Sequence, residues 1–282
     1  MILGIDVGNY NTTSSEGVIF ESKVSSINRE LRANKIVLEG EEYFIGQGSF
    51  DTQYRKAEKE TYIKLLYAAM CKSTDEEHIE LALGLPLSQY KTDKEALRKL
   101  IEENFYLRGT KEFYIENVEV YPEGLVCLDN DYEGILVDIG GRTTDVCFIE
   151  NVGSKRKVIN PSSLASGMIN LENDFINLLN NKYGLDLAIK DFKRIIRSGL
   201  KIYGEQQDIS FAINIFKEYL EQLLKDINLN YNLKLNNITF TGGGSLTLKN
   251  PILKRIPHAA ILDDSLFGNA NSFKRMLEEE YK

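Results

Sequence analysis

Residues 136–146 read LVDIGGRTTDV, and this stretch decides the fold. An apolar strand carries Asp138 near its end, a glycine pair follows, and hydroxyl side chains open a second apolar strand. Two apolar strands joined by a short glycine-containing turn predict a β-hairpin. Taken alone, the stretch indicates no more than a hairpin in which Asp138 caps the turn.

A second copy of the pattern stands near the N-terminus, where residues 3–13 read LGIDVGNYNTT. An apolar strand again ends close to an aspartate, Asp6, a glycine follows two residues later, and threonines open the next strand. Two such turns far apart in one chain predict two similar halves that face each other across a cleft.

The residue types in both turns suit phosphate binding. Glycine allows a tight turn and a close approach of the backbone to a ligand. Successive turn amides, together with asparagine and threonine side chains, form a concave donor surface that suits phosphate oxygens. The aspartates suit the water shell of Mg²⁺, which keeps several waters and uses few carboxylates. The two hairpins therefore predict a nucleotide held from both sides, with Asp6 and Asp138 binding Mg²⁺ through water.

A third glycine-rich element follows at residues 238–246, which read ITFTGGGSL. A strand, three glycines and a polar helix start allow the backbone to lie against a ligand at a helix N-terminus. Alone, this pattern is typical of a flexible loop. After two hairpins in the same chain, it favours a nucleotide site.

These three motifs resemble the first phosphate, second phosphate and adenosine motifs of the actin-like ATPase superfamily, which includes actin, heat-shock chaperone ATPases and sugar kinases. Residues 120–125, VYPEGL, look like the first connecting motif of bacterial plasmid-segregation actins of the ParM type. Residues 262–273, LDDSLFGNANSF, are similar to the second connecting segment of that group. The resemblance implies an α/β, two-domain actin/ribonuclease-H-like fold, with mixed sheets flanked by helices and a nucleotide cleft between the domains.

The resemblance also implies a set of site residues. Glu123 would orient the attacking water, and Asp138 would share the catalytic role while holding Mg²⁺ together with Asp6. Arg142 departs from the family pattern, since many relatives have Gly or Thr there. The residues expected to bind the nucleotide are Asp6, Gly8, Asn9, Asn11, Thr12, Gly140, Gly141, Arg142, Thr143, Gly167, Gly242, Gly243 and Gly244.

Some candidates keep a plain structural interpretation. Pro122 followed by Glu123 is typical of the first turn of a helix, where the dipole favours a carboxylate. Gly167 precedes a helix expected over residues 168–181 and is either a simple cap or a point of close ligand approach. Lys193 and Arg197 lie on a helix expected over residues 187–202. They could flank the base, but we favour solvated helix charges.

The 282-residue chain is long enough for two domains. We expect domain I at residues 1–133, with a small outer subdomain at about 25–74 and a completing C-terminal segment at 260–282, and domain II at 134–259. The net charge of −8, spread along the chain, argues against direct binding of DNA or of an anionic membrane. Three scattered cysteines, without a signal peptide or membrane-spanning run, predict a cytoplasmic protein.

The function that the resemblance implies is an ATPase that forms filaments and drives plasmid DNA segregation. ATP, with GTP as an alternative, and Mg²⁺ would be the cofactors, and hydrolysis would destabilise the filament. A separate adaptor protein, bound to a centromere-like DNA site, would connect filament and plasmid. Two alternatives remain open: a small-molecule kinase of the sugar or acetate type, and a nucleotide-dependent scaffold that does not hydrolyse.

Overall fold

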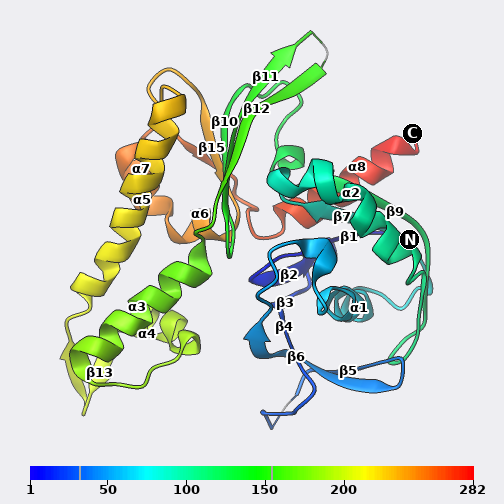
Figure 1. Cartoon of the computed structure of the whole chain (residues 1–282), viewed down its shortest axis with the longest axis horizontal. Coiled ribbons are helices and arrows are strands. Elements are labelled where there is room, and N and C mark those ends of the chain that lie inside the picture. Colours follow the sequence, from blue (N-terminus) through cyan, green and yellow to red (C-terminus); the bar gives the residue numbers. More distant parts are fainter. Residues whose placement is uncertain (32, 154) are drawn as a thin grey trace.

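Two α/β lobes lie side by side in the computed structural model, which describes residues 1–31, 33–153 and 155–282 (Figure 1). Each lobe is built on a sheet that mixes parallel and antiparallel strands and is flanked by helices. The predicted α/β architecture with mixed sheets is therefore confirmed. In the described part of the chain, no helix is both long enough and apolar enough to cross a membrane.

The first lobe contains a six-stranded sheet in the order β3-β2-β1-β7-β9-β8. Its central strand β1 pairs antiparallel with β2 and parallel with β7. Strands β1 and β2 therefore form a hairpin, and the chain reaches β7 through a crossover connection. The strands are β1 (Ile2–Val7), β2 (Asn11–Ser14), β3 (Ile19–Glu21), β7 (His78–Leu85), β8 (Tyr106–Leu107) and β9 (Phe113–Pro122).

The second lobe repeats this plan in a five-stranded sheet of order β12-β11-β10-β15-β16. Its central strand β10 pairs antiparallel with β11 and parallel with β15. The two aspartate-bearing hairpins therefore occupy matching places, which confirms the prediction of two similar halves. The strands are β10 (Gly134–Ile139), β11 (Thr144–Val152), β12 (Lys155–Leu164), β15 (Ile238–Thr241) and β16 (Ala260–Ile261).

Helices and small sheets complete each lobe (Figure 1). The first lobe carries α1 (Tyr62–Ser73), α2 (Leu87–Glu102), the 3-10 turns η1 (Lys56–Glu58) and η2 (Leu125–Cys127), and a small sheet of β4 (Lys23–Ser25), β5 (Lys35–Leu38) and β6 (Glu41–Phe50). The second carries η3 (Ile189–Asp191), α3 (Met168–Tyr183), α4 (Phe192–Ser198), α5 (Ser210–Asn230), α6 (Gly243–Thr247), α7 (Lys249–Arg255) and the strand pair β13 (Leu200–Ile202) and β14 (Glu205–Gln207).

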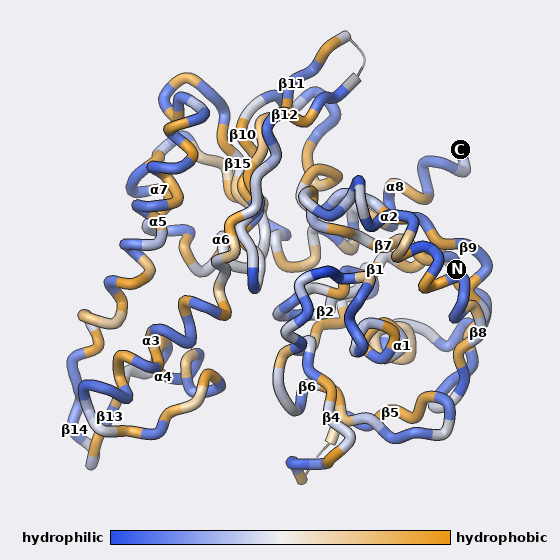
Figure 2. The backbone as a smooth tube through the Cα atoms, viewed as in Figure 1, coloured by the Kyte–Doolittle hydropathy of each residue, from blue (hydrophilic) through white to orange (hydrophobic). Residues whose placement is uncertain are grey.

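Each lobe has its own hydrophobic core. Helix α5 buries Phe216, Leu220, Leu223 and Ile227, a spacing of three and four residues that places them on one helix face. In the first lobe, α1 is buried over most of its length and packs beside β1. Figure 2 shows the apolar stretches gathered in the strands and on the inward sides of the helices.

The last helix, α8 (Gly268–Glu280), returns to the first lobe and packs on β1 and β7. Close contact is possible because two strand positions lack a side chain. A Cβ atom on Gly4 would lie 2.0 Å from the Ala270 oxygen, and one on Gly84 would lie 2.0 Å from the Phe273 ring. The C-terminal segment is thereby held beside the first aspartate-bearing hairpin.

Two sequence-based predictions of local structure are wrong. Pro122 ends strand β9 instead of opening a helix, and Glu123 continues the sheet by donating its amide to the Leu85 oxygen at 2.9 Å. The chain then turns at Gly124, which has a φ of +69°, into a 3-10 turn. The helix expected over residues 187–202 ends early at Gly199 (φ +75°), and strand β13 follows.

The predicted domain boundaries stay a prediction. The pairing of β16 with β15 carries the second sheet to Ile261, two residues past the expected end of domain II.

Candidate functional site

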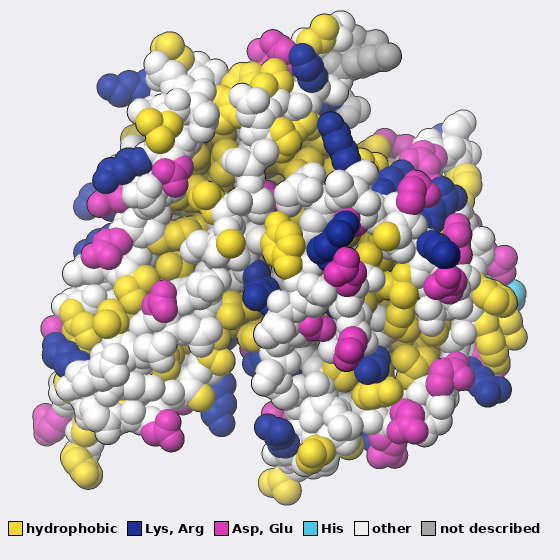
Figure 3. All heavy atoms as spheres, in the orientation of Figure 1, with side chains coloured by type: hydrophobic (Ala, Val, Ile, Leu, Met, Phe, Trp, Pro, Cys, Tyr) yellow, Lys and Arg dark blue, Asp and Glu magenta, His cyan; other side chains and the backbone are white. Residues whose placement is uncertain are grey.

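A cavity of about 210 Å³ lies between the two lobes and is lined by the turns of both hairpins. The space-filling view shows the notch that separates the lobes on one face (Figure 3). The predicted site residues that line this cavity are Asp6, Gly8, Asn9, Asn11, Glu123, Asp138, Gly140, Gly141, Thr143, Gly242, Gly243 and Gly244.

The two aspartates occupy equivalent positions of their hairpins. Asp6 on β1 is paired across the hairpin with Thr13 on β2, and Asp138 on β10 is paired with Asp145 on β11. In both cases the aspartate precedes the turn glycine by two residues. The fold thus brings two carboxylates, 132 positions apart by their residue numbers (138 − 6), to one cavity.

The third glycine loop lies against the end of β10. Gly242 has a φ of +81°, a backbone conformation that favours glycine. A Cβ atom there would lie 2.3 Å from Asp138 Oδ1 and 2.5 Å from the Ile139 oxygen. Only a residue without a side chain permits this approach, so the loop and the second hairpin form one continuous wall of the cavity.

Three predicted residues lie outside the cavity wall. The Thr12 hydroxyl is buried and shares a hydrogen bond with Ser22 at 2.9 Å, while Thr13 lines the cavity instead. Arg142 donates to the Asp51 backbone oxygen at 2.9 Å and so links the second hairpin to the first lobe. Gly167 supports the second hairpin from behind, since a Cβ atom there would lie 2.7 Å from the Gly140 oxygen.

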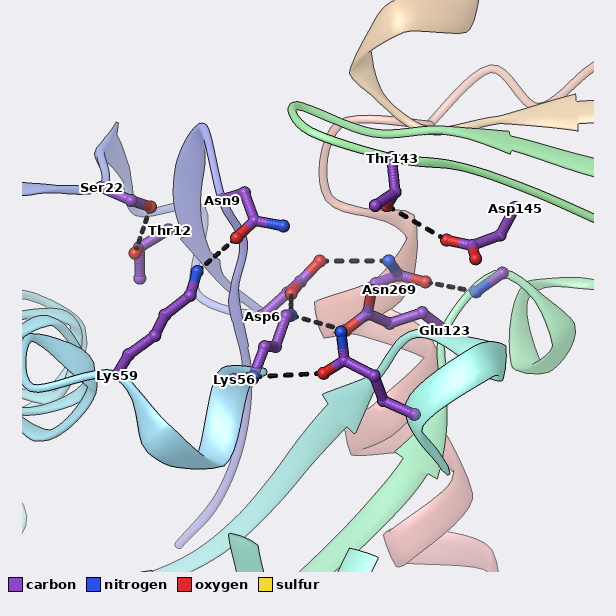
Figure 4. Close-up of polar contacts among 12 residues, drawn as sticks. Asp6, Asn9, Thr12, Ser22, Lys56, Lys59, Glu123, Thr143, Asp145 and Asn269 are labelled. Atoms are coloured by element: carbon purple, nitrogen blue, oxygen red, sulfur yellow. Dashed lines mark hydrogen bonds and ion pairs between the residues drawn. The ribbon is translucent and has the colours of Figure 1, made fainter. Parts of the chain in front are cut away.

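A buried lysine stands among the carboxylates (Figure 4). Lys56 is 1% exposed, and its Nζ lies 2.9 Å from Asp6 Oδ1 and 2.5 Å from Glu123 Oε1. Burial alone would lower the pKa of Lys56, but the two adjacent carboxylates outweigh it and raise that pKa above its ordinary value. Lys56 therefore forms ion pairs with two carboxylates inside the site.

The acidic groups outnumber this cation. Burial raises the pKa of Glu123 above its ordinary value, although the Lys56 ammonium opposes the shift. Burial, together with the nearby Asp145 and Asp6 carboxylates, raises the pKa of Asp138 to about 7. Buried carboxylates that repel one another are stabilised by an added cation, and oxygen ligands are those that Mg²⁺ prefers. Among the described residues, no three acidic, histidine or cysteine side chains form a direct metal site.

Asn269, in the first turn of α8, ties three parts of the site together (Figure 4). Its Oδ1 accepts a hydrogen bond from the Gly124 amide at 2.9 Å, so its Nδ2 is free to donate to Asp6 Oδ2 at 3.1 Å. The Gly124 backbone N–H can only donate, which fixes the orientation of the amide. The last helix thereby holds the first aspartate in place.

Lys59 orients a side chain of the first hairpin in the same way. It is 6% exposed, and its ammonium donates to Asn9 Oδ1. A lysine has donors only, so the Asn9 oxygen must face it and the Asn9 amide hydrogens are left for the cavity. Burial, with the neighbouring Lys56 charge, lowers the pKa of Lys59 to about 8. This arrangement presents donors, and therefore suits an anion.

The other end of the cavity is crossed by contacts between the lobes. Tyr10, in the first hairpin turn, donates to Glu172 Oε2 on α3 at 2.9 Å. Lys193 on α4 lies 3.3 Å from Glu21 Oε1 and covers the Tyr10 ring. Burial raises the pKa of Glu172 to about 7, although the Tyr10 hydrogen bond opposes the shift. Lys193 thus has structural partners and lines the cavity, whereas Arg197 does not line it.

Sequence reasoning missed several residues that the fold brings to the site: Tyr10, Lys56, Lys59, Asp145, Glu172 and Asn269. Tyr10 and Asp145 stand inside the two hairpin motifs, and Asn269 stands inside the late segment used for the resemblance. Their positions inside these motifs could have identified these three residues as site candidates. Lys56 and Lys59 lie in the charged run RKAEK, which is typical of a solvated surface and carries no such signal.

Two family models match the sequence. One, described as the N-terminal domain of actin-like proteins, matches residues 4–125, and the other, described as the C-terminal part of the archaeal actin homologue, MreB-like, matches residues 136–254. The chain belongs to the actin-like superfamily.

Solved structures of the same fold cover nearly all of this actin-like chain. A 15-stranded ParM filament from Clostridium botulinum superposes with a TM-score of 0.82 at 20% identity, and 99% of each chain is covered. The archaeal actin homologue Ta0583 in complex with ADP gives a TM-score of 0.80 at 18% identity, again with 99% of each chain covered.

The Alp12 filament structure gives a TM-score of 0.70 at 20% identity and covers 100% of this chain and 99% of its own. A comparison with curated protein sequences found no match. At these identities the structural likeness establishes the actin-like two-domain fold, and the predicted fold class is confirmed.

Proposed function

We propose that this actin-like protein binds and hydrolyses ATP between its lobes, forms filaments, and moves plasmid DNA apart through a separate DNA-binding adaptor. The observation that carries the proposal is the placement of two matching aspartate hairpins and a third glycine loop around one cavity. Each element offers backbone close to the cavity, as a polyphosphate ligand requires.

The residues around the cavity fit Mg²⁺ and a nucleoside triphosphate. Asp6 and Asp138 would hold the metal through water, and the buried acidic surplus around Asp138 favours a cation at that point. The Asn9 amide, held by Lys59, would donate to a phosphate oxygen, as would the turn backbone at Gly141. When bound, the nucleotide would supply the phosphoryl group, and Mg²⁺ would screen the negative charge of the phosphates.

Glu123 is the proposed water-positioning group. Its carboxylate lines the cavity and is fixed by Lys56 on one side, while its backbone is held by β7 on the other. A carboxylate with a raised pKa and a fixed position can orient a water molecule and accept its proton. This role replaces the helix-start interpretation, because β9 ends at Pro122 without a helix.

Filament formation is proposed from the similar solved structures, and the adaptor is proposed from the net charge of the chain. Chains that form ParM and Alp12 filaments share this fold over nearly their whole length. The net charge of −8 disfavours a DNA-gripping surface, so contact with DNA is assigned to a basic adaptor on a centromere-like site. Three free cysteines, Cys71, Cys127 and Cys147, suit a cytoplasmic location.

Light scattering, sedimentation and phosphate release, each after addition of ATP and Mg²⁺, test the proposal. A filament former scatters and sediments with ATP and then releases phosphate. A small-molecule kinase would stay dispersed and release no phosphate without a third substrate. A scaffold would assemble without phosphate release. Parallel runs with GTP would establish the base preference.

A further inference from the structure

Lys56 is a buried cation at the place where the proposed Mg²⁺ would approach the carboxylates. Its ammonium touches Asp6 and Glu123, two of the acidic residues that line the cavity, and Lys56 lines the cavity itself (Figure 4). The first lobe thus brings its own positive charge to the site, on a segment that lies outside both hairpins.

The segment that carries Lys56 is fastened to α2 and cannot swing away freely. The Lys56 amide donates to Gln89 Oε1 at 3.1 Å, and Gln89 Nε2 donates to the Tyr54 oxygen at 3.1 Å. Arg55 donates to Asp93 Oδ2 at 2.9 Å, and Asp93 is 1% exposed. The ammonium is therefore positioned by the backbone and not only by its carboxylate partners.

We propose that Lys56 is a positioning residue that acts as the resident counter-ion of the nucleotide site and keeps a free divalent cation away from it. It holds Asp6 and Glu123 together while the site has no nucleotide. Mg²⁺ alone would meet a fixed positive charge next to Asp6, and the repulsion disfavours binding. The repulsion is offset when anionic phosphates enter with the metal, so the site selects the metal–nucleotide complex. This inference rests on the proposed function.

The test uses nucleotide-free protein. MgCl₂ is titrated, at constant ionic strength set with NaCl, into the unchanged protein and into Lys56→Met, followed by melting temperature and titration calorimetry. We expect Lys56→Met to melt below the unchanged protein and to be restored by Mg²⁺, with an affinity for Mg²⁺ at least about tenfold higher. The unchanged protein should show no Mg²⁺-specific stabilisation.

Lys59→Met is the matched control, because it removes a second buried lysine charge three residues away that has no carboxylate within ion-pair distance among the described residues. It should melt lower but gain no response to Mg²⁺. An equal response of Lys59→Met and Lys56→Met would mean a general charge effect and would overturn the proposal, as would the absence of any response in Lys56→Met.

Lys56→Gln keeps amide donors for the carboxylates without the charge and serves if the methionine variant fails to fold. If neither variant folds, the unchanged protein decides: Mg²⁺ binding without nucleotide as tight as with ADP present overturns the proposal, and binding that requires ADP supports it. Failure of the proposed function is seen separately, as absence of nucleotide binding by the unchanged protein.

Discussion

Asn269 donates a hydrogen bond to Asp6 Oδ2 at 3.1 Å across 263 residues of sequence. The same amide accepts from the Gly124 backbone, one residue after Glu123. One side chain of the last helix therefore holds both the first proposed metal aspartate and the loop that carries the proposed water-positioning glutamate. Helix α8 therefore contributes to the site as well as to the packing of the first lobe.

Replacing Asn269 by alanine should weaken both stability and nucleotide binding. The change leaves a buried Gly124 amide without its acceptor, which costs about 1–3 kcal/mol in unfolding free energy. Denaturant unfolding and nucleotide titration measure the two effects. Asn271→Ala is the control, since Asn271 is exposed on the same helix and pairs only with Asp264. Equal losses in the two variants would contradict a special role for Asn269.

Asp138→Ala should lose Mg²⁺-dependent nucleotide binding while the protein stays folded. Groups that orient the water shell of a metal typically contribute about 10- to 100-fold in metal affinity. The fold should tolerate the change because Asp138 is a buried acid that is repelled by Asp145 and Asp6. Titration calorimetry with and without Mg²⁺, beside circular dichroism, tests this. Asp131→Ala, an exposed aspartate before the same strand, should behave as the unchanged protein.

Glu123→Gln should separate chemistry from assembly. The amide oxygen still accepts from Lys56, so the site keeps its geometry, but a general base is lost and phosphate release should fall by about 100-fold or more. Sedimentation with ATP should persist, and the filaments should last longer. Glu116→Gln, at an exposed position of the same strand, is the control. Phosphate release at the unchanged rate would return Glu123 to a purely structural role.

Glu172 should make stability depend on pH. Its pKa is about 7 in the folded protein and about 4.3 in the unfolded chain, so the folded state binds more protons between these values. Stability should therefore fall as pH rises from about 4 to 7, by up to about 3 kcal/mol from this group.

Glu172→Gln keeps an acceptor for Tyr10 and removes the titration, so the difference in unfolding free energy from the unchanged protein isolates this group. Denaturant unfolding across the pH range measures it. The exposed Glu218→Gln should leave the profile as it was. Parallel pH profiles for the unchanged protein and Glu172→Gln would show that Glu172 titrates at its ordinary pKa.

The purified protein should not bind plasmid DNA by itself, with or without ATP. Binding to the phosphate backbone needs clustered basic side chains and weakens steeply with salt, whereas this chain carries a net charge of −8. Gel shifts at low and moderate salt measure it, and addition of adaptor with its DNA site should lengthen filament lifetime. Tight, salt-sensitive binding by this chain alone would contradict the adaptor proposal.

The hairpins, the glycine loop and the repeated two-lobe plan could be predicted from sequence. Turn and strand signals are local, because a tight turn requires glycine within a few residues of the strands that it joins. The error at Pro122–Glu123 arose where tertiary pairing overrode a local helix signal: the Glu123 amide joins β7 instead. The early end of the helix after residue 187 has a local cause, the left-handed backbone at Gly199.

By itself, the sequence determined which strands carry Asp6 and Asp138 next to their last residue and that a glycine follows two residues after each aspartate. Only the tertiary structure decided that Lys56 and Asn269 meet these carboxylates, because their partners lie 50 and 263 residues away. The burial of Lys56 was likewise decided by the tertiary structure. A lysine in a charged run has the same local pattern whether it faces water or two carboxylates, and the environment of Lys56 exists only once the first lobe has folded.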